Sequence, residues 1–119
     1  MKKISATLLF LFIVAAVSAQ IPIKLEDVNK HIGDSVTVCG KVAGMRYFEN
    51  SKNKPTFLNI GANHPNQLIT VVVWETTRAL FTDKVENLMN KDICITGRII
   101  LYKERPEIVI EKPEQIVIQ

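Results

Sequence analysis

Apolar and β-branched residues alternate with polar ones along much of the chain after residue 34, and this alternation predicts strands. In the first run, over residues 35–47, Val36, Val38 and Val42 share one face. Gly40 lies in its middle, where a missing side chain often marks a bulge or a sharp bend. Six short β runs separated by turn residues indicate a barrel or a sandwich. After the first run, the other five cover residues 56–60, 68–74, 92–102, 107–111 and 115–118.

Two segments show the spacing of helices instead. Apolar residues recur every three or four positions over residues 25–32, and Gly33 follows as a helix stop. The same spacing recurs over residues 81–88, where Asp83 and Glu86 have the Asp-x-x-Glu arrangement of a capping box. The predicted order is therefore a short helix, three strands, a second helix, two strands and a tail.

The first residues have the pattern of a bacterial secretory signal peptide. Lys2 and Lys3 form a basic start, residues 8–17 are apolar, and small residues lead to a cleavage site after Ala19. This apolar stretch is shorter than the about 20 residues that a transmembrane helix needs, although an uncleaved anchor is the alternative. We therefore expect a cleaved signal peptide over residues 1–19 and one domain over residues 20–119, periplasmic or secreted and not attached to a membrane.

Removing the signal peptide changes the charge of the working protein. The whole chain has 15 basic and 12 acidic residues, and two of the lysines lie within residues 1–19. The mature chain would keep 13 basic residues against 12 acidic ones, a net charge of +1. Bulk charge therefore does not indicate nucleic-acid binding, and any such function must depend on local clusters of cations.

The motifs of common enzymes are missing from the sequence. His31 and His64 lie outside any spacing of Cys, His and acidic residues that would hold zinc, and there is no nucleophile elbow, phosphate loop or paired-acid motif. We expect no catalytic residue, no metal site and no cofactor, and hence a binding protein and not an enzyme. The later acidic residues are expected to form a solubilising face: Glu104, Glu107, Glu111 and Glu114.

Two of the predicted strands repeat one pattern. Residues 36–42 and 93–99 both read apolar-x-apolar-x-Gly-basic-apolar, which suits two long strands that each bend at a glycine. With the flanking strands and helices, this order resembles the nucleic-acid-binding OB-fold over residues 25–118, most closely its anticodon-binding type and small exported bacterial relatives. The resemblance implies a mostly β, five-stranded Greek-key barrel that is partly open, with a helix between strands 3 and 4 and a short N-terminal helix.

The resemblance also implies where a ligand binds. OB-folds bind on strands 2 and 3, between the loops that join strands 1 to 2 and 4 to 5. Here those loops cover residues 46–55 and 103–105, and both are rich in cations. Cations beside aromatic rings are what single-stranded nucleic acid requires. The implied nucleic-acid-binding residues are Arg46, Tyr47, Lys52, Lys54, Phe57, Asn59, Trp74, Lys103 and Arg105.

Other interpretations of the same residues stay open. Loop cations are often only solvated, and large aromatic residues such as Phe57 and Trp74 more often belong to the core of a small barrel. OB-folds also bind oligosaccharides, so a protein or an oligosaccharide is the alternative partner. Steep weakening of binding with salt would distinguish nucleic acid from a sugar.

Cys39 and Cys94 occupy matching positions in the two repeated segments. In an OB-fold, strands 1 and 4 are neighbours, so the resemblance implies that the two sulfur atoms can meet. Disulfides persist in exported proteins, and we therefore expect a Cys39–Cys94 disulfide. The alternative is a pair of free thiols packed side by side.

Overall fold

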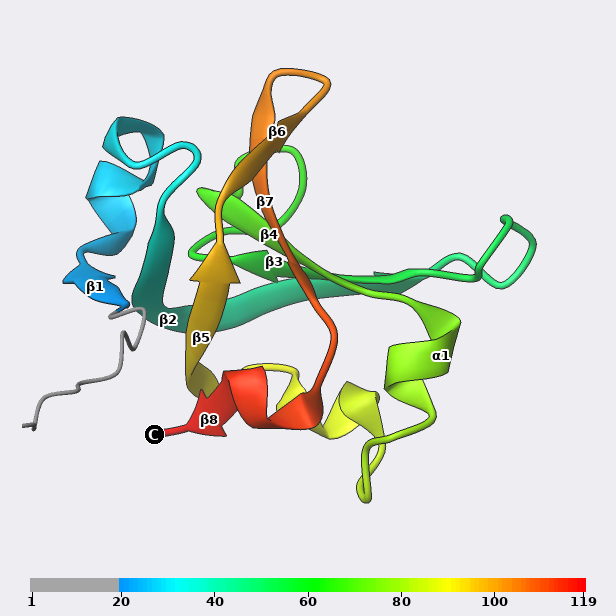
Figure 1. Cartoon of the computed structure of the whole chain (residues 1–119). Helices are drawn as coiled ribbons and strands as arrows, with labels where there is room; N and C mark the ends of the chain where they lie inside the picture. The colour runs from blue at the N-terminus through cyan, green and yellow to red at the C-terminus, as the bar shows by residue number, and fades with distance from the viewer. Residues whose placement is uncertain (1–19) are drawn as a thin grey trace, which may run out of the picture.

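The computed structural model of the chain describes residues 20–119, and the predicted signal peptide lies outside the described residues. Figure 1 shows a curved sheet with short helical turns around it. None of the helices within residues 20–119 is long and apolar enough to cross a membrane. In chain order, with η for a 3₁₀ helix, the elements are β1 (Ile21–Ile23), η2 (Leu25–Lys30), β2 (Ser35–Tyr47), β3 (Thr56–Ile60), β4 (Ile69–Val73), α1 (Glu75–Arg78), η3 (Val85–Leu88), β5 (Asp92–Arg98), β6 (Ile100–Tyr102), β7 (Arg105–Ile110), η4 (Pro113–Gln115) and β8 (Ile116–Ile118).

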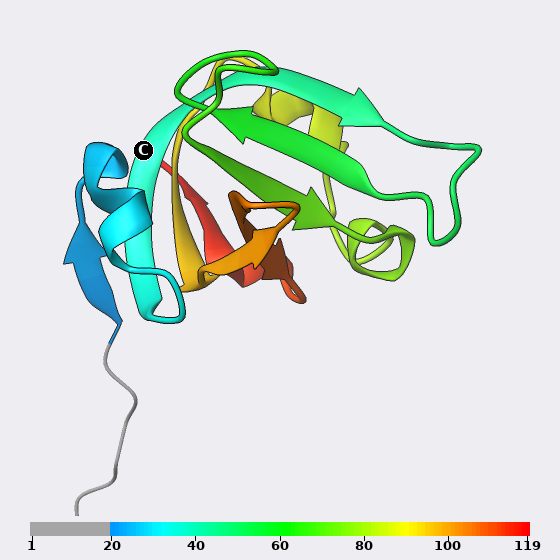
Figure 2. The ribbon, with the colours of Figure 1, turned by 90° about the horizontal axis from the view of Figure 1, so that it is seen from above.

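Strand β2 belongs to both halves of the sheet. Residues 35–41 pair antiparallel with β5, and residues 42–47 pair antiparallel with β3. Figure 2 shows the resulting arc of β2 over the molecule. The strand bends where it changes partner, and there a Cβ on Gly40 would lie 2.6 Å from Cγ2 of Ile60. This close approach explains why the position is a glycine.

A β-bulge follows immediately. The register with β3 shifts between Val42 and Gly44, so Ala43 is an extra residue in the ladder. Because successive side chains point to opposite faces, one extra residue exchanges the faces of everything that follows. Val42 is part of the core and Met45 packs against it, whereas Arg46 is exposed. Uninterrupted alternation would have placed Arg46 on the same face as Val42.

The strands follow the order β6-β7-β4-β3-β2-β5-β8, and β1 pairs with β2 outside this path. The five expected barrel strands are present in the expected order as β2, β3, β4, β5 and β7. The predicted count of five is nevertheless wrong, because β1, β6 and β8 extend the sheet to eight strands. The path ends at β6 and β8 without a pairing between them, so the barrel is not closed.

The predicted strand over residues 92–102 is in fact two strands, β5 and β6, separated at Ile99. The Ile99 N–H donates to the Asp34 carbonyl at 3.0 Å, and the Ile99 carbonyl accepts from the Gly33 N–H at 2.7 Å. Ile99 therefore bonds to the turn after η2, and its side chain is fully buried. The tail beyond Pro113 forms η4 and then β8, which pairs with β5.

The helices are shorter than predicted. The first is the 3₁₀ helix η2, and the single helix expected between strands 3 and 4 is replaced by two short turns, α1 and η3. The predicted capping box is wrong, because the N-cap of η3 is Lys84 and no side chain caps it. The Glu86 carboxylate accepts from Arg78 instead, which removes it from a capping role.

The inward-facing side chains form one apolar core, and neither Phe57 nor Trp74 belongs to it. Most of its members are β-branched, as expected for a small barrel of twisted strands. Its buried residues are Val28, Val36, Val38, Val42, Leu58, Ile60, Ile69, Val71, Val73, Val85, Leu88, Ile93, Ile95, Ile99, Ile108 and Ile110.

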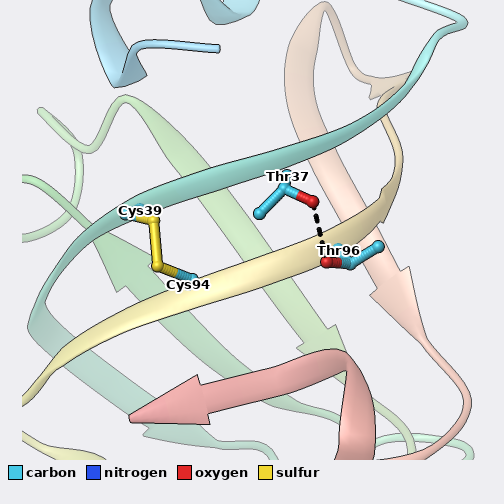
Figure 3. Close-up of a disulfide and its surroundings, with 4 residues drawn as sticks. All are labelled: Thr37, Cys39, Cys94 and Thr96. Atoms are coloured by element: carbon cyan, nitrogen blue, oxygen red, sulfur yellow. Dashed lines mark hydrogen bonds between the residues drawn. A yellow bond between two sulfur atoms is a disulfide. The ribbon is translucent and has the colours of Figure 1, made fainter. Parts of the chain in front are cut away.

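The predicted disulfide between Cys39 and Cys94 is confirmed, and it joins β2 to β5 (Figure 3). The two cysteines are direct partners in the antiparallel register of these strands. The next pair on the same face, Thr37 and Thr96, joins its hydroxyl groups in a hydrogen bond of 3.0 Å. A covalent link and a polar pair therefore hold this half of β2 to β5.

Candidate nucleic-acid interface

Two rows of side chains cross the outer face of the sheet, which is the face of β2, β3, β4 and β7 turned away from the core. In the first row, Arg46 is the partner of Phe57, Phe57 of Val72, and Val72 of Val109. Arg46 is exposed, Phe57 and Val109 are half-buried, and Val72 is only 2% exposed. This row is an apolar strip with a cation at one end.

The second row is polar and lies beside the first. Gly44 is the partner of Asn59, Asn59 of Thr70, Thr70 of Glu107, and Glu107 of Ile100. Asn59 and Thr70 are only 5% and 4% exposed, although they point away from the core. The outer face thus carries an apolar strip next to a strip of hydrogen-bonding groups.

Aromatic rings and a cation form a stack at the β2 side of this face. The ring centroids of Phe48 and Phe57 lie 4.8 Å apart, with the planes inclined by 58°. The Arg46 guanidinium lies 4.7 Å from the centroid of the Phe48 ring. A stack of this kind can extend onto a further flat group, because guanidinium and aromatic faces both accept stacking partners.

Hydrogen bonds fix the polar row. The Gln67 side-chain amide donates to the Thr70 hydroxyl at 3.1 Å, and the Thr70 hydroxyl donates to Oδ1 of Asn59 at 3.2 Å. The Gln67 Oε1 atom is buried and has no hydrogen-bond partner within the described residues. A buried acceptor without a protein donor is unusual in a folded protein.

Glu107 does not have the solubilising role that the sequence suggested. It is half-buried in the polar row beside Thr70, and this burial raises the pKa of its carboxyl group. No salt bridge to Glu107 occurs among residues 20–119. An acidic group therefore lies on the β7 side of the outer face, without a salt bridge within the described residues.

Two projecting segments carry cations at the borders of this face (Figure 1). The β2–β3 loop, residues 48–55, extends at the right of the view and holds the exposed Lys52 and Lys54. The β6–β7 hairpin rises at the top of the view, and the Lys103 ammonium at its tip lies 5.3 Å from the ring centroid of Tyr102. Arg105, at the start of β7, donates to the carbonyl of Pro65 in the β3–β4 loop.

The β3–β4 loop, residues 61–68, approaches the outer face closely. A Cβ on Gly44 would lie 2.0 Å from Oδ1 of Asn63, so the Asn63 side chain packs directly on the β2 backbone at this glycine. The loop therefore contacts β2 through Asn63, the polar row through Gln67, and β7 through the Pro65–Arg105 bond.

The structure brings together most of the residues that the sequence suggested for nucleic acid. Arg46, Phe57 and Asn59 lie on the outer face, and the four loop cations border it. Trp74 lies just after β4 and is half-buried beside Asn53, whose carbonyl accepts from the Glu75 N–H at 3.0 Å. Trp74 is therefore at the base of the β2–β3 loop and not in either row.

Tyr47 is the exception and does not lie on this face. It follows Arg46, so it points to the opposite side of the strand. Its hydroxyl donates to the Glu75 carboxylate at 3.0 Å, and the Arg78 guanidinium lies 4.3 Å from its ring centroid. The hydrogen bond to Glu75 raises the pKa of Tyr47. Tyr47 thus holds helix α1 against the end of β2.

Part of the outer face was not predicted from the sequence. Thr70 and Val72 lie in the predicted strand over residues 68–74, but the sequence did not indicate which face they are on. Gln67 and Val109 were not predicted to take part in the site. Thr70 is the one polar residue between Leu68 and Trp74 in the sequence, and this break in the run was the available indication.

Acid should weaken the contact between Arg78 and Glu86 near α1. The hydrogen bond from Arg78 lowers the pKa of Glu86, so the folded state binds fewer protons than the unfolded state. The stabilisation is therefore present above the usual glutamate pKa and is lost as pH falls through the lowered value. Glu86 is 47% exposed, so we expect Glu86→Gln to cost less than about 1 kcal/mol near neutral pH and a smaller amount in acid, below the usual glutamate pKa. Urea unfolding at both pH values checks this, and an equal cost at both would contradict it.

Comparisons with known proteins concern the fold. No model of a protein family matches the chain, and no curated protein matches its sequence. A chain in the crystal structure of yeast Stn1 and Ten1 matches with a TM-score of 0.62 and 14% identity, over 85% of this chain and 63% of that one. A protein named as an aspartyl-tRNA synthetase from Leishmania major Friedlin matches with a TM-score of 0.50 and 9% identity, over 87% of this chain and 21% of that one.

The chain spans less than two thirds of the length of each of these two neighbours. At such low identities the likeness shows the fold and not the ligand. Together with the strand order of the sheet, it establishes that residues 20–119 form a mostly β fold of the OB type.

Proposed function

We propose that the chain binds single-stranded nucleic acid on the outer face, without catalysing a reaction. The observation that carries this proposal is the stack of Arg46, Phe48 and Phe57 on the outer face. Single strands are bound by flat rings that stack on bases and by cations that follow the phosphates. The stack supplies the first, and Lys52 and Lys54 in the adjacent loop supply part of the second.

The position of the stack supports the same function. It lies on the β2–β3 part of the sheet, with the cationic β2–β3 loop beside it and the β6–β7 hairpin at the other border. OB-folds bind oligonucleotides between the corresponding loops. The name of one structural neighbour, an aspartyl-tRNA synthetase, also refers to an RNA substrate.

The disulfide supports the proposed location outside the cytoplasm. Cys39 and Cys94 are bonded, and disulfides persist in oxidising compartments such as the periplasm. We propose that the mature chain acts in the periplasm or in the medium, after cleavage of the signal peptide.

An oligosaccharide is the second candidate ligand, and the polar row favours it. Asn59, Thr70 and Glu107 beside the apolar strip would also suit sugar hydroxyl groups above an aromatic ring. The two candidates differ in their response to salt, because a neutral sugar releases no counterions when it binds.

Fluorescence anisotropy with labelled single-stranded DNA and RNA of about 12 nucleotides tests the proposal. Residues 20–119 should bind both, and contacts with three phosphates would weaken binding roughly 20-fold between about 50 and 200 mM salt. The double variant Lys52→Glu with Lys54→Glu should bind more weakly and show a shallower salt dependence.

The matched control is Lys24→Glu with Lys84→Glu, which makes the same charge change beside η2 and η3. This control should bind nearly as the wild type does. Equal losses in the two double variants would mean that only net charge matters, and an absence of binding at low salt would refute the proposed function.

A further inference from the structure

The polar row of the outer face ends in hydrogen-bond acceptors that have no donor. Gln67 Oε1 is buried without a partner, and Glu107 has no salt bridge within residues 20–119. Glu107 lies beside Thr70 in the parallel register of β4 and β7, and Thr70 accepts from Gln67. Two acceptor groups therefore flank one threonine.

The side-chain amide of Gln67 is oriented with its NH₂ group toward Thr70. The Thr70 hydroxyl has one hydrogen, and it is donated to Oδ1 of Asn59. The Thr70 oxygen must then accept from the Gln67 NH₂ group. The Gln67 carbonyl oxygen is consequently left without a donor, and it is an acceptor in this network.

The Glu107 carboxylate reinforces this acceptor character. An ionised carboxylate only accepts hydrogen bonds, and its burial without a donor is unfavourable. The raised pKa of Glu107 has this cause. A ligand that brings an N–H group to Glu107 would satisfy this carboxylate.

Charge also determines which part of a nucleotide can lie here. A phosphate above Glu107 would be repelled, whereas Lys52 and Lys54 on one border and Lys103 on the other attract phosphates. A bound strand would therefore keep its phosphates at the borders and place its bases over the two rows.

We infer that Glu107, beside Thr70 in the polar row, recognises the edge of a base, so that the outer face prefers bases with an exocyclic amino group over thymine and uracil. Cytosine, adenine and guanine each present an NH₂ group, and carboxylates accept from the amino group of cytosine. Thymine and uracil have no amino group and present only one ring N–H between two carbonyl oxygens, and a carboxylate repels these oxygens. This inference rests on the proposed function and adds the class of base to it.

The experiment compares oligo-dC with oligo-dT of equal length at the same salt concentration. Both are pyrimidines of the same charge, so the comparison isolates the amino group from phosphate contacts. We expect the wild type to bind oligo-dC at least about fivefold more tightly. Glu107→Gln should abolish most of this preference, because its amide can donate to the O4 atom of thymine.

Glu104→Gln at the hairpin tip is the matched control. It removes the same charge, so it should strengthen binding to both oligonucleotides equally and keep the preference. Thermal unfolding of each variant shows whether it is folded, and the comparison in the wild type does not depend on any variant.

The outcomes separate the inference from the proposed function. Salt-dependent binding of equal strength to oligo-dC and oligo-dT would overturn base recognition and leave nucleic-acid binding intact. A preference that persists in folded Glu107→Gln would overturn the role of Glu107. An absence of binding to either oligonucleotide would overturn both proposals.

Discussion

Replacing both cysteines, as Cys39→Ala with Cys94→Ala, should lower the free energy of unfolding by about 4 kcal/mol. The disulfide joins residues that are 55 positions apart, so it restricts a large part of the unfolded chain. Loss of this restriction stabilises the unfolded state by the entropy of loop closure. Urea unfolding of oxidised wild type and of the double variant measures the difference.

The control for the disulfide uses the same two strands. Thr37→Val with Thr96→Val replaces both hydroxyl groups on the same face by methyl groups and should cost at most about 1 kcal/mol. Wild type in a reducing buffer should match the cysteine variant. Equal urea midpoints for oxidised wild type and the cysteine variant would contradict a stabilising role of the cross-link.

Phe57→Leu should weaken binding of single-stranded nucleic acid by about 5- to 150-fold. Leucine keeps apolar volume beside Phe48 and Val72 but offers no flat face, and loss of a stacked ring costs about 1–3 kcal/mol per base. Anisotropy titrations at low salt measure the change. The salt dependence should stay the same, because no cation is removed.

Tyr47→Phe is the matched control for Phe57→Leu. Tyr47 lies on the neighbouring strand but on the other face, where its hydroxyl contacts Glu75. The variant should lose part of its stability and none of its affinity. If Phe57→Leu bound single-stranded nucleic acid as tightly as the wild type does, the aromatic stack would not be part of the binding site.

Much of the fold could be predicted from the sequence, because inward-facing apolar residues define each strand. The predicted ranges of β2 and β3 agree with the structure residue for residue. The break at Ile99 could not be predicted, since Ile99 is apolar and bonds to the distant backbone of Asp34. Strand β1 was missed for a similar reason, because its three residues gain their structure from pairing with β2.

The candidate site could be predicted only in part. Arg46 and Phe57 follow from the loop position and the type of residue. The polar row could not be assembled, because Asn59, Thr70 and Glu107 become neighbours through the register of three strands. Tyr47 was included because of its place in the predicted loop, and the bulge at Ala43, which turns it to the other face, is not visible in the sequence.

The bulge in β2 also has a consequence for comparing this protein with others of its fold. Deleting Ala43 would turn Arg46 toward the core and Met45 toward the outer face, although no residue of either face had been substituted. A gapless alignment with a strand that lacks the bulge would therefore match core positions with surface positions. Binding residues in such proteins should be transferred only after β2 has been aligned on its bulge.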